Sequence, residues 1–417
     1  MRSRGNCLKL LIYEHASAGG YAEGSVSPSM LSEGFGMLRS AVSCFKAAGH
    51  NVTVVLADGL SKLNPPLNTD CVLPVSNFKE AQDTIRKACG KVDAALVVAP
   101  ETGGVLQSLV ELVEQTGVAS LNCKSAVIRA VSNKADLYEK LKAKGIIIPE
   151  TISLSFSDDL SNIKSAIKGK FSFPVLFKPV EGEGCSGISI ASSETQIDAA
   201  IAKVKSQSQC GRFLVQEYLT GHAASVSLLS TGEKALPLSL NEQKVTLATP
   251  DGDSSYDGGV VPFEHPFWLE ALDVAQQVAD CFCGLRGYFG VDVVLSADGP
   301  VVVDVNPRLT TSFVGLSSSS GLNVSEALLN AVLKRELPSV MFFQGFACFE
   351  KLRTPVHSIS VLQRLYGLRE VVSPPFPVPS CNDGCALILC KGNTAKEAVA
   401  RLEEAKKHTL NIINRGK

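Results

Sequence analysis

The sequence has almost no net charge and no long apolar run. Its 40 lysines and arginines nearly balance 41 aspartates and glutamates, so the formal charge of the 417-residue chain is −1. Without a basic excess there is no reason to expect nucleic acid or an anionic membrane as a partner. No apolar stretch reaches the length of a bilayer-spanning helix, and the run LKLLIY near the N-terminus is too short for a secretory signal. We therefore expect a cytoplasmic protein with no membrane partner.

The cysteines lack the spacing of zinc sites. There are 13 of them and no C-x-x-C pair. The close pairs Cys281/Cys283 and Cys381/Cys385 have no second pair at the spacing that a zinc site needs. Free thiols in a reducing compartment are the expected state. The pattern G-x-x-x-x-G-K-[ST] is also absent, which excludes a P-loop.

A chain of this length should fold as two or three domains. In the first part, expected strands at 8–13, 51–56 and 94–99 alternate with expected helices at about 30–48 and 105–115. This alternation predicts a parallel α/β layer, and such layers bind ligands at the carboxyl ends of their strands. Those ends carry Glu14, His15, Gly19, Gly20, Glu101 and Gly103-Gly104. The glycines can equally be turn residues, and a lone histidine is more often hydrogen-bonded than catalytic.

Two short helical patterns, KSAVIRAV and SNKADLYEKLKAKG, begin at about residue 123. Ser132 has the residue type and place of an N-cap for the second helix. Lys134 then lies in the first helical turn, where the helix dipole disfavours a cation. The lysine is either solvated or placed to meet an anion. A strand is expected to start at Ile146.

The segment PVLFKPVEGEGCSGISIAS (174–192) contains G-x-G-x-x-G at Gly182, Gly184 and Gly187. A dinucleotide fingerprint must open a helix, whereas ISIAS alternates apolar and polar residues as a strand does. We therefore predict a glycine-rich hairpin tip, whose backbone N–H groups can close over phosphates. Lys178 stands in the incoming apolar strand and needs an anionic partner there.

The segment RFLVQEYL (212–219) predicts a strand with a polar and aromatic end, and 225–229 predicts the returning strand. The linker between them can present backbone donors and acceptors to a flat base. NEQK (241–244) and the loop 248–259 precede an expected helix at about 267–285. That loop is either a lid or a disordered surface loop.

The stretch 287–312 predicts two adjacent strands joined by a turn at Ala297-Asp298-Gly299-Pro300. Asp292, Asp304 and Asn306 can then face one another, and such hard oxygen ligands suit Mg²⁺. Arg308 follows on the same side, as a fixed cation for a transferred phosphoryl group or an acyl phosphate. The alternative is a hairpin with surface acids.

The part after Arg335 predicts a third unit. It has β-like stretches at 346–349, 358–362 and 385–390, with a proline-rich connector at 373–379. A helix is expected at about 394–410, and nothing in this unit requires catalysis.

Taken together, these motifs resemble the ATP-grasp superfamily. The matching residues are Lys134, Lys178 with the glycine flap, VQEYL at 215–219, and Asp292 with DVNPR at 304–308. The resemblance implies an α/β and α+β protein that holds ATP between two α+β subdomains. It implies a pre-ATP-grasp α/β domain at 1–122, an ATP-grasp domain at 123–338 with its flap subdomain at about 146–218, and a small C-terminal α+β domain at 339–417.

The resemblance also implies roles for single residues. The residues that would contact the phosphates are Lys134, Lys178, Gly184 and Gly187. Adenine would be bound through the backbone of Glu217, Tyr218 and Leu219. Two Mg²⁺ ions, with Mn²⁺ as an alternative, would be held by Asp292, Asp304 and Asn306, and the catalytic residues would be Arg308 and Lys178.

Three positions depart from the family pattern. Asp304 stands where glutamate is usual and is one methylene shorter. No acid stands near 222–224, where the ribose ligand usually lies. D-alanine ligases carry an arginine at the position of Gly290 for the acyl phosphate. Arg308 matches instead the N-P-R pattern of carbamoyl-phosphate synthetases and biotin carboxylases.

Within the superfamily, YEHASAGG, NEQK and DVNPRLTTS resemble the tyramine–glutamate ligases of methanofuran biosynthesis. The narrower match implies an ATP-dependent amide bond between the γ-carboxylate of glutamate and a tyramine- or tyrosine-like amine, formed through an acyl phosphate. The substrate candidates are Glu14, His15, Gly19, Gly20, Lys244, Thr310, Thr311 and Ser312. The alternative functions are a bicarbonate-using carboxylase or carbamoylating enzyme and a non-catalytic nucleotide-binding protein. A homodimer is a possible assembly.

Overall fold

The computed structural model describes residues 7–21, 26–62, 67–182, 184–208, 210–355, 358–378 and 381–415. Some predicted features therefore lie outside the described residues, namely Glu183 of the flap, 22–25 of the first loop and Pro379 of the connector. Within the described ranges, no helix has the length and apolar character that crossing a membrane requires.

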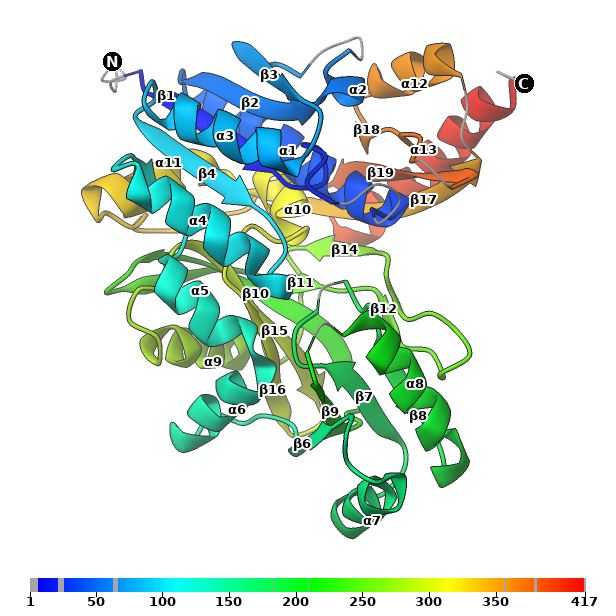
Figure 1. Cartoon of the computed structure of the whole chain (residues 1–417). Coiled ribbons are helices and arrows are strands. Elements are labelled where there is room, and N and C mark those ends of the chain that lie inside the picture. Colours follow the sequence, from blue (N-terminus) through cyan, green and yellow to red (C-terminus); the bar gives the residue numbers. More distant parts are fainter. Residues whose placement is uncertain are drawn as a thin grey trace.

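The N-terminal layer is a parallel sheet, as predicted (Figure 1). Its strand order is β3-β2-β1-β4-β5. Helix α1 begins after Ser27, whose side chain accepts a hydrogen bond from Met30 N, and Pro28 occupies its first turn. The elements are β1 (Lys9–Glu14), α1 (Pro28–Ala47), β2 (Asn51–Ala57), α2 (Asp58–Ser61), β3 (Cys71–Val75), α3 (Phe78–Cys89), β4 (Ala94–Val98), η1 (Thr102–Gly104), α4 (Val105–Gln115) and β5 (Ala119–Ser120).

The central sheet is antiparallel with the order β11-β10-β15-β16. The predicted strand pair is confirmed, and Asp292 lies opposite Asp304 in the register. Helix α9 packs against this sheet. The elements are α5 (Ser125–Ser132), α6 (Lys134–Ala143), β10 (His222–Thr231), β11 (Ala235–Glu242), α9 (Trp268–Asp280), β15 (Arg286–Ser296) and β16 (Gly299–Asn306), with the short strands β12 (Val245–Thr246) and β13 (Ser255–Tyr256) beside it.

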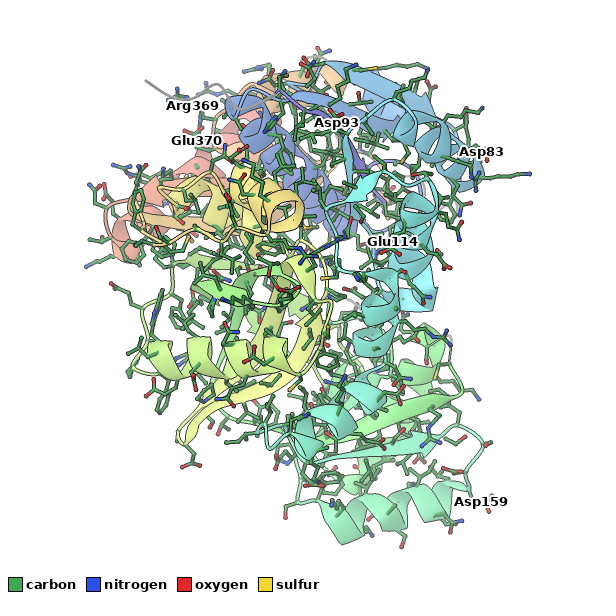
Figure 2. All side chains as sticks on the ribbon, turned by 90° about the vertical axis from the view of Figure 1, so that its left-hand side faces the viewer. Asp83, Asp93, Glu114, Asp159, Arg369 and Glu370 are labelled. Atoms are coloured by element: carbon green, nitrogen blue, oxygen red, sulfur yellow. The ribbon has the colours of Figure 1, made fainter. Side chains whose placement is uncertain are left out.

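A second antiparallel sheet, β6-β9-β7-β8, forms the flap subdomain. It occupies the lower end of the molecule in Figure 1, and Figure 2 shows Asp159 at that end, far from Asp93. The glycine-rich segment joins β7 to β8 and opens no helix, so the hairpin prediction is confirmed. The elements are β6 (Thr151–Ser155), α7 (Leu160–Lys170), β7 (Val175–Pro179), β8 (Ser189–Ala191), η2 (Glu194–Gln196), α8 (Ile197–Gln207) and β9 (Arg212–Glu217).

The C-terminal sheet has the order β14-β17-β19-β18, and so includes a strand that precedes α9 in the chain. It lies beside the N-terminal layer (Figure 1), and Arg39 of α1 donates to Val371 O at 2.7 Å. Helix α10 packs against α1, β14 and β17. The elements are β14 (Gly258–Val261), α10 (Ser312–Ser319), α11 (Val324–Leu329), η3 (Asn330–Lys334), β17 (Phe346–Pro355), α12 (Ile359–Tyr366), β18 (Val371–Ser373), β19 (Asp383–Gly392) and α13 (Ala395–Arg415).

Several local predictions were wrong. The stretch 358–362 is not β-like but begins α12, because Val361, Leu362 and Leu365 put one apolar helical face into the core. Ser132 does not cap α6, since its hydroxyl donates to Ile128 O within α5. The cap is Asn133, whose Oδ1 accepts from the first-turn amides.

Three boundaries also differ. Strand β6 begins at Thr151 and not at Ile146, because Pro149 has no amide hydrogen for a ladder. Helix α9 ends at Asp280, before the turn that contains Gly284, which has a left-handed φ of +97°. Helix α13 continues to Arg415, burying Ile412 and Ile413.

Candidate active site

A cavity of about 310 Å³ lies where the N-terminal layer, the flap sheet and the central sheet meet. Its walls come from α1, the loop after β4, β7 with the glycine flap, and the facing strands β15 and β16. Apart from Gly187, the residues predicted for phosphate and metal binding and the predicted catalytic arginine line it, namely Lys134, Lys178, Gly184, Asp292, Asp304, Asn306 and Arg308.

Two carboxylates form the floor of the cavity. Asp292 accepts hydrogen bonds from Asn306 Nδ2 at 2.9 Å and from Gln243 Nε2 at 3.1 Å. Burial and the charge of Asp304 together raise the pKa of Asp292 to about 7. A carboxylate pair in such a place is stabilised by a cation that removes the repulsion.

The residues present fit Mg²⁺ better than a cation that needs an all-protein cage. Among the described residues no group of three or more histidines, cysteines or acids could enclose an ion. Two carboxylates and one amide leave room for waters and phosphate oxygens, which Mg²⁺ prefers to keep.

Lys134 starts α6 and reaches the carboxylate pair, with Nζ 2.9 Å from Asp304 Oδ2 and 3.4 Å from Gly182 O. Burial opposes the charge of Lys134, but the Asp304 carboxylate outweighs it and raises the lysine pKa. This lysine therefore connects Asp304, one of the two paired carboxylates, with the glycine flap.

Lys178 is buried on β7, with 4% of its surface exposed. Its ammonium donates to the Tyr138 hydroxyl and, at 3.3 Å, to Val303 O. Burial lowers its pKa to about 8, with Asp304 opposing the shift. A cation held mainly by neutral oxygens gains most from an incoming anion.

Arg308 follows β16 and links the central sheet to the N-terminal layer. Its Nε lies 2.9 Å from Oε1 of Glu101, which is 7% exposed at the carboxyl end of β4. Its Nη1 donates to Leu309 O at 3.2 Å. The guanidinium is thus fixed in place at the cavity wall.

Glu14 lines the cavity, but its own loop holds its carboxylate. Oε1 accepts from Ala16 N at 3.0 Å, and Oε2 accepts from Ser17 N at 2.8 Å and Ser17 Oγ at 2.5 Å. Burial raises the pKa of this carboxyl despite these bonds. Glu14 therefore shapes the turn after β1.

His15 lies outside the cavity lining. Its Nδ1 is 2.9 Å from the Tyr13 hydroxyl, and its ring packs edge-on against Tyr21 and Phe78. Burial lowers its pKa to about 4. Gly20 packs against this ring so closely that a Cβ would lie 2.2 Å from Nδ1. The substrate candidates His15, Gly19 and Gly20 are therefore part of a packed loop, not of the cavity wall.

The adenine candidates lie at the end of β9. Glu217 Oε1 accepts from Glu150 N at 2.8 Å, and Tyr218 is 37% exposed. Gln216 lines the cavity, whereas Glu217, Tyr218 and Leu219 do not. Gly187 is also absent from the cavity lining. It packs against Gln207 of α8, because a Cβ at Gly187 would lie 3.0 Å from the Gln207 side chain.

Lys244 points away from the cavity, because its Nζ pairs with Glu350 Oε2 at 2.8 Å. Sequence reasoning missed its neighbour Gln243, which lines the cavity and donates to Asp292. The sequence carried no clear signal for it, because β11 ends at Glu242 and Gln243 lies just beyond the strand.

The predicted small-residue segment does line the cavity. Thr310 Oγ1 is 3.0 Å from the Tyr288 hydroxyl, and Ser312 Oγ is 3.3 Å from Ser225 Oγ. Thr311 Oγ1 donates to Glu33 Oε2 at 2.7 Å. Glu33 lies on α1 and had no signal in the sequence, because only the fold brings α1 to this wall.

Comparison with known proteins gives the family. Residues 131–312 match the model of the ATP-grasp domain, and residues 50–128 match that of the pre ATP-grasp 3 domain. The tyramine–L-glutamate ligase of Methanocaldococcus jannaschii is 26% identical over 330 residues, which cover 79% of this chain and 90% of that protein.

Solved structures agree on the fold. An ATP-grasp superfamily protein from Archaeoglobus fulgidus superposes with a TM-score of 0.62 and 25% identity, covering 91% of this chain and 99% of that one. The L-amino acid ligase of Bacillus licheniformis superposes with a TM-score of 0.66 and 15% identity, covering 96% of each chain.

The fold, the cavity and the family matches together define a protein in which a pre-ATP-grasp layer is followed along the chain by an ATP-grasp domain. The chain belongs to the ATP-grasp superfamily. Its ATP-grasp domain and the relatives named as ligases support its assignment to the ATP-dependent carbon–nitrogen ligases.

Proposed function

We propose that this protein joins a carboxylate, the γ-carboxylate of L-glutamate, to a tyramine- or tyrosine-like amine at the expense of ATP, in methanofuran-type cofactor synthesis. One observation carries the proposal. The paired carboxylates Asp292 and Asp304, with Lys134 bound to the second, lie in one cavity with Lys178 and Arg308. The similarity to tyramine–L-glutamate ligases supports the choice of substrates.

Amide formation needs an activated acid, because oxide is too poor a leaving group. Transfer of the γ-phosphoryl group from ATP to the carboxylate gives an acyl phosphate and ADP. The amine nitrogen then attacks the acyl carbon, the bond from this carbon to the phosphate oxygen breaks, and phosphate leaves with the electron pair. An ammonium substrate loses one proton before it attacks and a second as the amide forms, and these protons pass to the departing phosphate and to solvent.

The protein contributes mainly positioning and charge. Mg²⁺, when bound to Asp292, Asp304 and Asn306, supplies charge neutralisation on the phosphates. Lys134 and Lys178 hold the phosphate oxygens between the flap and the central sheet. Arg308, held by Glu101, faces the carboxylate that becomes phosphorylated.

Two loops are proposed to exclude water during this step. The loop at 248–259 is hydrogen-bonded to the flap strand, through Ile190 N to Ala248 O at 2.9 Å and Ser254 Oγ to Ile188 O at 2.8 Å. The flap and the loop should therefore close together. Adenine is proposed to lie against the end of β9, near the backbone of 217–219.

The test is Mg²⁺-dependent phosphate release from ATP with L-glutamate, with and without tyramine or tyrosine, and with the product mass read alongside. Phosphate release with the mass of the amide is expected. Release only with other acid–amine pairs would retain the ligase and remove these substrates. Release that requires bicarbonate would favour the carboxylase alternative, and no release with any pair would favour a binding protein.

A further inference from the structure

One face of α1 is turned toward the cavity. Met30, Glu33, Gly34 and Met37 line it, at the spacing i, i+3, i+4 and i+7 of a single helical face. Glu33 is the one ionisable residue among these four. The phosphate-binding lysines come from other walls, on α6 and β7. The cavity therefore has an apolar wall with one carboxylate in it.

Three protein donors hold this carboxylate in place. Glu33 Oε1 lies 2.5 Å from Lys351 Nζ, and Glu33 Oε2 accepts from Thr311 at 2.7 Å. Lys351 is a β17 residue whose side chain is 8% exposed, and it also donates to Ser29 Oγ and Tyr256 O. The donors of Lys351 are thus occupied by protein oxygens. The Ser29 hydroxyl also donates to Glu33 Oε1, at 3.4 Å. A carboxylate accepts about four hydrogen bonds, so these three donors leave Glu33 capacity for one donor from a ligand.

A second buried polar atom at this wall has only a weakly placed neighbour, Ser312, among the described residues. The Tyr256 hydroxyl is buried beside Ser312, and it makes no hydrogen bond of ordinary geometry within the described part of the chain. Tyr256 lines the cavity. A buried hydroxyl left without a good partner destabilises the fold unless a ligand or water satisfies it.

Glu33, Tyr256 and Asp292 line the same cavity, so this wall and the carboxylate pair belong to one site. The charges of Glu33 and Asp292 both act on the Tyr256 hydroxyl, and they add to the burial that raises its pKa. Gly34 allows α1 to pack closely on the carboxyl end of β1, because a Cβ there would lie 2.4 Å from Glu14 Oε1.

We propose that this wall is the acceptor-amine subsite, in which Glu33 binds the ammonium group of a primary amine and Met30 and Met37 contact its apolar body. Tyr256 gives or accepts a hydrogen bond at the same substrate. Lys351 is a positioning residue that fixes Glu33, and the C-terminal sheet thereby completes the amine site. This inference rests on the proposed function and adds the location of the amine.

Hydroxylamine separates the two halves of the reaction. It is uncharged at neutral pH, and it captures an acyl phosphate as a hydroxamate without needing an ammonium site. Each variant is assayed twice with ATP, Mg²⁺ and L-glutamate, once with hydroxylamine and once with tyramine, and kcat and KM are determined for the amine. Glu33→Gln should keep hydroxamate formation within about twofold and raise the amine KM about tenfold or more, because a charge-assisted hydrogen bond is lost.

The matched control is Lys406→Gln. Lys406 lies on α13 and pairs with Glu350, which precedes Lys351 on β17, and neither member of this pair lines the cavity. It should change neither assay. Lys351→Met should behave as Glu33→Gln does, and Lys351→Arg should restore part of the amine affinity. Met37→Ala provides a test that leaves the ion pair intact, and it should weaken tyramine more than methylamine.

Equal loss of hydroxamate and amide in folded Glu33→Gln would overturn the inference, because Glu33 would then serve the acid or the nucleotide. An unchanged amine KM would overturn it as well. A wild-type protein that forms neither product with any acid–amine pair would instead overturn the proposed function, and this inference with it.

Discussion

Asp292 and Asp304 lie directly opposite each other on β15 and β16, close enough for the charge of one to raise the pKa of the other. Two acids so placed in a buried wall repel one another, and the arrangement costs stability unless a cation is present. Lys134 balances only part of this charge, through Asp304.

Replacement of Asp304 by asparagine should remove the proposed metal site. We expect Mg²⁺-dependent phosphate release to fall by about a hundredfold or more, because the ion loses a charged ligand where the phosphates gain charge. Asp298→Asn is the control, since Asp298 lies exposed in the turn between the same strands. Unchanged turnover in Asp304→Asn would refute the metal assignment.

Arg308→Ala should reduce turnover by about a hundredfold or more while ATP binding persists, because the arginine is proposed to act on the acyl phosphate and not on the nucleotide. Turnover is measured by phosphate release and binding by calorimetry. Glu101→Gln should give a smaller loss, since it weakens the hold on Arg308 without removing the guanidinium. The control is Arg335→Ala, whose exposed pair with Glu233 is remote from the cavity lining. Equal activity in both alanine variants would count against the role of Arg308.

The pKa of Lys178 gives a pH dependence for ATP capture. Because burial lowers this pKa to about 8, the free enzyme loses the charge as the pH rises through 8. We expect kcat/KM for ATP to fall above that pH, while kcat falls less, since bound phosphate holds the proton. Lys178→Arg should lack this fall because arginine stays charged. A wild-type profile that is flat to pH 10 would contradict the prediction.

His15 gives a pH dependence of stability without one of catalysis. Its pKa is about 4 in the fold and about 6.5 when unfolded. The unfolded chain therefore binds the proton first, and stability is lost as the pH falls from about 6.5 toward 4, by up to about 3 kcal/mol. Urea unfolding at several pH values should show this slope, and His15→Gln should lack that part of it. Catalytic failure of a stable His15→Gln variant would show that the histidine reaches the substrate after all.

The helix cap provides a paired stability test. Asn133→Ala should lower the free energy of unfolding by about 1 kcal/mol, because the first-turn amides of α6 lose their acceptor. Ser132→Ala should cost less than about 0.5 kcal/mol, since it removes only a bond within α5. Thermal or urea unfolding measures both, and the reverse order would restore Ser132 as the cap.

The parts of the fold that depend on local pattern could be predicted from the sequence. Short apolar runs in alternation with loops and helical segments predicted β1, β2 and β4 of the N-terminal layer, and turn chemistry predicted the β15–β16 pair. The glycine flap was recognised because Ile188 and Ile190 follow strand spacing. The same approach failed at α12, where a short apolar run is compatible with either structure.

The residues of the candidate site also fall into those that the sequence could identify and those that it could not. Lys134, Lys178, Asp292 and Arg308 carry ionic groups at fixed spacing, so a motif could identify them, and they meet in the cavity. Glu33 could not be found, because its environment depends on Lys351, more than three hundred positions later. His15 was overvalued for the opposite reason, since its residue type suggested chemistry, whereas its surroundings are aromatic packing.

The pairing of β14 with β17 bears on how the chain is made. A ribosome releases the N-terminal layer and the central sheet first, and each can begin to fold on its own. The edge of β14 that pairs with β17 then stays unpaired until β17 and β19 have left the ribosome. Since Lys351 lies on β17, the wall that contains Glu33 is the last part of the cavity to be assembled. A nascent chain would therefore form the proposed phosphate-binding side of the cavity before the proposed amine-binding wall, and the two would face each other only once β17 has left the ribosome.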